Sequence, residues 1–193
     1  MIKTRFSKGF CILIFFLILF SSCALSDKAK WEKDWEPFFR RASLLLDLKI
    51  EKPDGEDWKK ESGDIVVRFK KTINSLDDSV QAVVQIRDDV PNHINTLTEL
   101  KNYYQKQKYS SVIEAVYNEK IIESTTVLEY EVLASTEKNH LLRIKGILYF
   151  HPKSPHDVID IGYSRKNKNG IIEIEYQKVG QKFINNFIIN NQI

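Results

Sequence analysis

The feature that most constrains this chain is a period-two alternation of apolar and polar residues, which recurs between residues 44 and 164. Residues 79–87 show it clearly, since Val80, Val84 and Ile86 alternate with residues such as Gln81 and Gln85. Successive side chains of a strand point to opposite faces, so this pattern is typical of a strand with one buried face. We therefore expect a largely antiparallel sheet that is packed on one side.

The same pattern predicts further strands at residues 44–50, 65–71, 127–133, 140–150 and 158–164. We expect the first of them to end at Pro53, because proline cannot donate to a strand ladder. The strands at 65–71 and 79–87 are expected to form a hairpin with its turn at Asp77 and Asp78. Residues 109–116 fit either the end of a helix or a strand.

Two segments have the spacing of amphipathic helices. The first, at residues 96–106, starts with Thr96 and Glu99, which have the spacing of a capping box. The second covers residues 171–189 and repeats apolar residues every three or four positions: Ile172, Tyr176, Val179, Phe183 and Phe187. Together, these elements predict an α+β fold with a central antiparallel sheet of about six strands flanked by helices.

The first 23 residues have the layout of an export signal. Three basic residues precede an apolar run at residues 10–20, and two serines stand directly before Cys23. The run is shorter than the about 20 apolar residues of a membrane-spanning helix. The arrangement resembles the lipobox of bacterial lipoproteins, with Phe20 where that family prefers leucine. The resemblance implies that Cys23 becomes the lipidated N-terminus; the alternative is an ordinary signal that leaves a secreted protein with one free thiol.

We therefore expect a signal peptide at residues 1–22, a lipidated tether at 23–30 and a single α+β domain at 31–193. Once the signal's three basic residues are removed, 26 Lys and Arg stand against 26 Asp and Glu. The domain then lacks the basic charge that nucleic-acid binding requires. Cys11 lies in the signal and Cys23 takes the lipid, so no disulfide is expected. The glycines are scattered singly, which excludes glycine-rich phosphate-binding loops.

The order of elements resembles the PsbP/Mog1-like fold. The segment 44–53, followed by Trp58 and a strand, looks like the opening of such domains. The helix start at 95–100 and the closing helix with Phe183 and Phe187 lie where that family has its helices. The resemblance implies an antiparallel sheet flanked by helices and a role in binding and assembly. It carries over no catalytic residues.

His151, His156 and Asp157 are the best candidates for a metal site, since two imidazoles and a carboxylate close in sequence can converge on a divalent cation. The competing interpretation is a solvated turn between two strands. The spacing matches no recognised metal motif, which favours the turn. We predict no metal, cofactor or catalytic residue, and a metal-assisted hydrolase that uses both histidines is the least favoured function.

Two groups of aromatic residues are candidates for contacts. The first follows the tether closely: Trp31, Trp35, Phe38 and Phe39. Tryptophan favours the membrane–water boundary, so this group is a candidate for a membrane-interface contact, although a helix packed on the domain by this face is slightly favoured. The second suits either a binding groove or half-buried surfaces: Tyr103, Tyr104, Tyr109 and Tyr117.

These observations predict a non-enzymatic bacterial envelope lipoprotein that is held to a membrane by lipid on Cys23. Its domain is expected to bind a protein partner in the assembly or maintenance of an envelope complex. The alternative is a surface-exposed lipoprotein that binds an external ligand or host molecule. Ala24, rather than aspartate, follows the lipidated cysteine, which favours the outer membrane over the inner membrane.

Overall fold

The fold is known from a computed structural model that describes residues 36–75, 77–107, 109–122, 124–136 and 140–191, with the backbone alone for 36–38. Residues 41–193 form one compact unit. The described helices are α2 (Glu36–Leu46), α3 (Leu97–Lys106) and α4 (Ile174–Asn190). The described strands are β1 (Lys59–Ser62), β2 (Val66–Ser75), β3 (Asp78–Arg87), β4 (Val112–Ile122), β5 (Thr125–Ser135), β6 (Leu141–His151) and β7 (Ser154–Asn167).

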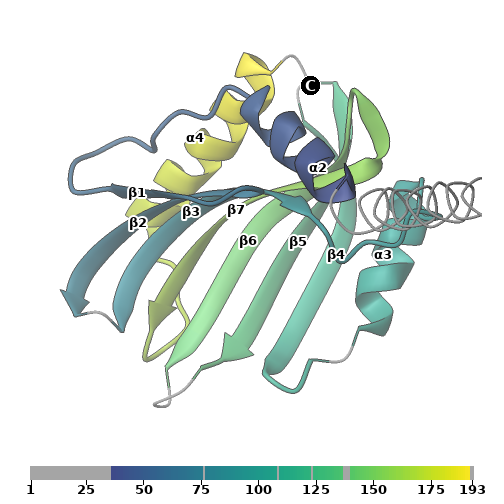
Figure 1. The fold of residues 1–193 in the computed structure, drawn as a ribbon. Coiled ribbons are helices and arrows are strands. Elements are labelled where there is room, and N and C mark those ends of the chain that lie inside the picture. The colour runs from purple at the N-terminus through teal and green to yellow at the C-terminus, as the bar shows by residue number, and fades with distance from the viewer. Residues whose placement is uncertain (1–35, 76, 108, 123, 137–139, 192–193) are drawn as a thin grey trace, which may run out of the picture. The chain divides into compact units, whose positions relative to one another are not determined.

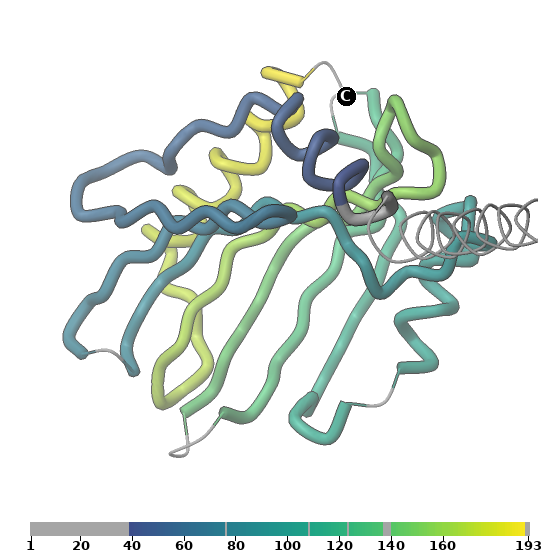
Figure 2. The backbone as a smooth tube through the Cα atoms, viewed as in Figure 1, coloured from purple at the N-terminus to yellow at the C-terminus, as the bar shows by residue number. Residues whose placement is uncertain are grey.

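The described strands form one antiparallel seven-stranded sheet in the order β1-β2-β3-β7-β6-β5-β4 (Figure 1). Two meanders, β1–β3 and β4–β7, are joined through α3, and the last strand returns to pair with β3 (Figure 2). The predicted α+β class and antiparallel sheet are confirmed. The expected number of about six strands is wrong, because the described part of the chain has seven.

One face of the sheet packs against α4 and against the end of α2. Its core contains Val84, Ile159 and Ile161 from the central strands, which are fully buried. The predicted stripe of α4 covers them through Phe183 and Phe187. Buried aliphatic and aromatic side chains each stabilise the fold by about 1.5–3 kcal/mol, so this layer is the main source of stability.

Helix α3 begins as the sequence predicts. The Thr96 side chain accepts a hydrogen bond from the Glu99 amide at 3.2 Å, and the Glu99 carboxylate accepts one from the Thr96 amide at 3.2 Å. This reciprocal pair satisfies amides that have no partner within the helix. Leu100 and Tyr104 then face the sheet, on the side opposite α4, where they pack with Leu148 and Val158.

The strand predicted at residues 44–50 is wrong, because α2 continues through Leu46. Leu44 and its neighbour Leu45 are both buried, whereas Leu46 is 84% exposed. Adjacent residues share a face in a helix, where they are about 100° apart, but not in a strand. The run of leucines therefore fits one buried helical stripe better than the alternation that it also resembles.

Two strands have no apolar–polar alternation that could predict them. Strand β1 consists of Lys, Lys, Glu and Ser, all exposed, and it pairs with β2 from Lys59 opposite Lys70. Strand β4 is exposed along most of its length, and it shows that the ambiguous segment 109–116 is a strand from Val112 onwards. Within the described ranges, no helix is long and apolar enough to cross a membrane.

Candidate functional site

The face of the sheet away from α4 carries a pocket of about 420 Å³. Helix α3 covers one end of this face, over β4 and β5, and the rest is left partly open. The floor contains half-buried apolar side chains from β3, β5 and β6: Val83, Val132, Leu142 and Ile144. The same strands bury Val84 and Ile147 completely on the α4 side. The half-buried apolar side chains of these strands therefore lie on the pocket face, opposite this buried core.

A row of paired residues across the sheet explains why the pocket can hold a tyrosine at its centre. The register places Tyr117 opposite Tyr130, Tyr130 opposite Gly146, and Gly146 opposite Gly162. A Cβ atom on Gly146 or Gly162 would lie 2.6 Å or 2.8 Å from the Tyr130 hydroxyl. The two glycines therefore provide the space in which the Tyr130 side chain lies over β6 and β7.

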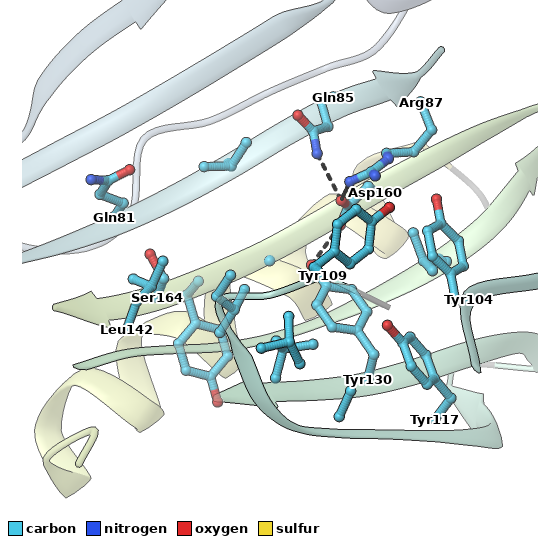
Figure 3. Close-up of a pocket in the computed structure, with 18 of the residues that line it drawn as sticks. Gln81, Gln85, Arg87, Tyr104, Tyr109, Tyr117, Tyr130, Leu142, Asp160 and Ser164 are labelled. Carbon is cyan, nitrogen blue, oxygen red and sulfur yellow. Dashed lines mark hydrogen bonds and ion pairs between the residues drawn. The ribbon is translucent and has the colours of Figure 1, made fainter. Parts of the chain in front are cut away.

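The Tyr130 hydroxyl reaches the Asp160 carboxylate, which is the centre of a hydrogen-bond network (Figure 3). Tyr130 donates to Oδ1 of Asp160 at 2.7 Å. Gln85 Nε2 donates to Oδ2 at 2.8 Å, and Arg87 Nη1 donates to the same oxygen at 3.1 Å. Asp160 is nearly buried, and its charge is compensated by these donors.

Arg87 is held on two further sides. Its Nε and Nη2 atoms donate to the two carboxylate oxygens of Asp89 at 2.8 Å and 2.7 Å, which is a bidentate ion pair. Its guanidinium carbon lies 5.5 Å from the centre of the Tyr104 ring. Burial alone would raise the pKa of Asp89, but the hydrogen bonds and charge of Arg87 outweigh it and keep that pKa below 3.8. The charges at this end of the pocket are therefore paired with one another.

Tyrosine rings form a continuous wall beside this network. The rings of Tyr104 and Tyr117 are stacked with centroids 5.8 Å apart, and Tyr117 and Tyr130 follow at 6.3 Å. Tyr103 contacts Tyr104 edge to face at 5.2 Å, and its hydroxyl donates to the Asp89 carbonyl at 2.5 Å. Tyr109, at the start of the second meander, lines the pocket with about half of its surface exposed (Figure 3).

The ionisation of these groups determines what the pocket can do chemically. Burial, with the nearby Asp160 carboxylate, raises the pKa of Tyr130 well above 10.0. Burial also raises the pKa of Tyr104 and of Tyr117. All three phenols are therefore neutral hydrogen-bond donors at physiological pH. The pocket offers neutral aromatic and aliphatic surface, with polar groups at its inner end.

Of the tyrosines predicted as a possible groove, Tyr104, Tyr109 and Tyr117 line the pocket. Tyr103 does not line the pocket, but its ring contacts that of Tyr104. The sequence alone did not indicate a role for Asp160, Arg87 or Tyr130. A signal for Tyr130 was present in Gly146 and Gly162, since single glycines inside strands often mark the close approach of another group.

The structure does not bring His151, His156 and Asp157 to a common point. His151 is buried and its Nδ1 accepts a hydrogen bond from the Lys153 amide at 3.0 Å, whereas His156 is exposed. Asp157 is buried and accepts hydrogen bonds from Arg41 Nε at 3.1 Å and Ser154 Oγ at 2.5 Å. No group of three or more His, Cys, Asp or Glu side chains within the described residues is placed to hold a metal ion.

The predicted membrane-contact and lipidation residues lie largely beyond the described part of the chain. Cys23, Trp31 and Trp35 are outside it, as is the side chain of Phe38. Phe39 lies in α2 and is 51% exposed. No protein-family model matches the chain, and no curated protein matches its sequence.

Proposed function

We propose that this chain is a bacterial envelope lipoprotein that binds a protein partner through the pocket beside β3 and β5–β7, without catalysing a reaction. Lipid on Cys23 would anchor it, with the outer membrane favoured, and the partner would belong to an envelope complex that the lipoprotein helps to assemble or maintain. The observation that carries the proposal is a tyrosine-walled pocket whose apolar floor is left half exposed.

The charge of the pocket favours a neutral group on the partner. Arg87 is paired with Asp89 and Asp160, so inserting a charged group would have to displace an internal ion pair. Aromatic rings and one arginine beside an apolar floor are typical of protein-interface hot spots. An apolar or aromatic side chain of the partner would gain about 25 cal/mol for each Å² of apolar surface that it buries there.

Anchoring is tested by labelling cells with a fatty-acid probe, for the natural chain and for Cys23→Ser. We expect the label to be lost in Cys23→Ser, because the lipid is attached at that sulfur and at the new amino terminus. Label that survives the substitution would contradict anchoring at Cys23. Protease treatment of intact cells distinguishes the surface-exposed alternative, which predicts cleavage from outside.

Partner binding is tested by affinity purification of the full-length chain from detergent-solubilised envelopes. Val83→Lys places a charge on the pocket floor, and Lys178→Glu, on an exposed position of α4, is the matched control. We expect a discrete set of proteins to co-purify with the natural chain and with Lys178→Glu, and to be lost with Val83→Lys at unchanged melting temperature. An identical set from all three would place the binding surface elsewhere.

A further inference from the structure

The two edges of the sheet differ in how they are protected against pairing with another strand. An unpaired edge presents backbone amides and carbonyls to any extended segment, and natural proteins keep such edges short or charged. Strand β1 follows this rule, since it has four exposed residues of which two are lysines. Strand β4 is not protected by shortness, because it is an outer strand of 11 residues.

Strand β4 also exposes apolar side chains along this edge. Ile113, Val116 and Ile121 are 60%, 43% and 71% exposed. Among the described residues, β5 is the only strand that pairs with β4, and α3 packs over the pocket face of the two strands through Leu100 and Tyr104. Within the described ranges, the second edge of β4 therefore carries no paired strand.

From this edge we infer that β4 pairs antiparallel with β4 of a second copy of the chain, across a two-fold axis at Tyr117. Such an axis stands perpendicular to the sheet, so both copies keep the same face on the same side. Residues opposite each other must then belong to the same face, and one residue of β4 must lie opposite itself. The possible registers are therefore those in which the axis passes a single residue of β4.

The charges of β4 select one of these registers. With Tyr117 opposite Tyr117, Glu114 of each copy lies opposite Lys120 of the other, so two oppositely charged pairs form by symmetry. When the centre moves to Val116 or Asn118, Glu114 and Lys120 lie opposite uncharged residues. The regular part of β4 begins at Glu114, just after the irregularity near its start, so the paired segment Glu114–Lys120 is uninterrupted.

Within one copy, Lys120 already contacts Glu129 of β5, with Nζ 2.6 Å from Oε1. Both side chains are exposed enough for Lys120 to turn towards Glu114 of the second copy. A substitution of Lys120 therefore removes the ion pair with Glu129 as well as the ion pair between the two copies. An exchange of the two charges separates these effects.

The first experiment measures the dimer dissociation constant of the full-length chain in detergent by analytical ultracentrifugation. Glu114→Lys and Lys120→Glu each create two pairs of like charges, and we expect each to weaken the dimer at least about tenfold. The double variant Glu114→Lys/Lys120→Glu restores opposite charges and should regain the natural constant, although it still lacks the contact with Glu129. Lys60→Glu on β1 is the control and should have no effect.

A chain that is monomeric at all concentrations, single variants that dimerise normally, or a double variant that stays weak would each overturn the inference. Hydrogen exchange on the natural chain gives a test that requires no substitution. The amides of Glu114–Lys120 should gain protection as protein concentration rises, and those of Lys59–Ser62 should not. Equal protection of β4 at all concentrations would also overturn it.

Discussion

At the scale of single residues, the space left by Gly146 and Gly162 decides how Tyr130 lies on the sheet. Their positions in adjacent strands are paired, and together they leave a shallow path across β6 and β7. Tyr130 lies along this path and reaches Asp160 with its hydroxyl. The pocket, its tyrosine wall and its buried carboxylate therefore depend on two residues that contribute no side-chain contacts.

The variant Gly162→Ala tests this dependence. Its new Cβ would lie 2.8 Å from the Tyr130 hydroxyl and 3.0 Å from the Lys145 carbonyl oxygen, so the tyrosine has to move. We expect a loss of about 1–3 kcal/mol in the free energy of unfolding, measured with urea. In a Tyr130→Ala background the same substitution should cost clearly less, since the closest neighbour of the new Cβ is gone.

The control for this variant is Gly63→Ala, at an exposed position where the nearest atom would be Val66 Cγ1 at 3.1 Å. It should change the free energy of unfolding by less than about 0.5 kcal/mol. If Gly162→Ala is as mild as this control, or equally costly with and without the Tyr130 ring, the proposed role of the glycine is wrong.

At the scale of elements, a strand can be predicted from the sequence where one of its faces is buried, because burial imposes an apolar–polar alternation. Residues 79–87 alternate because β3 has α4 above one face, and the strand was predicted within one residue of its bounds. The capping box at Thr96 predicted the start of α3 for a similar reason, since its hydrogen bonds are local. All four residues of β1 are exposed, so their composition carries no strand signal. The strand forms because it pairs with β2.

The contribution of the capping box to stability can be measured at Thr96. Thr96→Ala leaves the Glu99 amide without its side-chain acceptor, and we expect the free energy of unfolding to fall by about 1 kcal/mol. Thr96→Ser keeps a hydroxyl at the same place and should retain most of the stability. Equal losses in the two variants would show that the hydroxyl is not the stabilising group.

At the scale of the whole molecule, the pocket joins residues that are far apart in the sequence. Gln85 and Asp160 are 75 positions apart and meet because β7 pairs with β3 after three intervening strands. The chain order alone does not indicate that the last strand returns to the centre of the sheet. The tyrosines of α3 and β4 could be recognised in the sequence as a group of aromatic residues. Asp160 and Arg87 could be placed beside them only once the order of the strands was known.

The buried tyrosines also predict how stability depends on pH. Burial raises the pKa of Tyr130, Tyr104 and Tyr149 above the 10.0 of an exposed tyrosine. The folded state therefore keeps protons that the unfolded state releases, and stability is unaffected by these groups below about pH 10 and falls above it.

This fall is measured by urea unfolding between pH 8 and pH 11, with tyrosinate absorbance recorded in parallel. We expect the absorbance of the buried tyrosines to rise only together with unfolding. In Tyr130→Phe the dependence of unfolding free energy on pH should be shallower, because one fewer proton is released. Full ionisation of all tyrosines before unfolding would contradict the burial described for these rings.

Partner binding at the pocket is tested most directly by photo-cross-linking in intact cells, with a photoreactive amino acid at Gln81 on the pocket face. The same residue at Lys178 on α4 provides the comparison. We predict a discrete cross-linked protein from Gln81, absent from Lys178 and reduced when Cys23→Ser removes the anchor. A cross-link pattern that is the same from both positions, or no cross-link from Gln81, would contradict partner binding at the pocket.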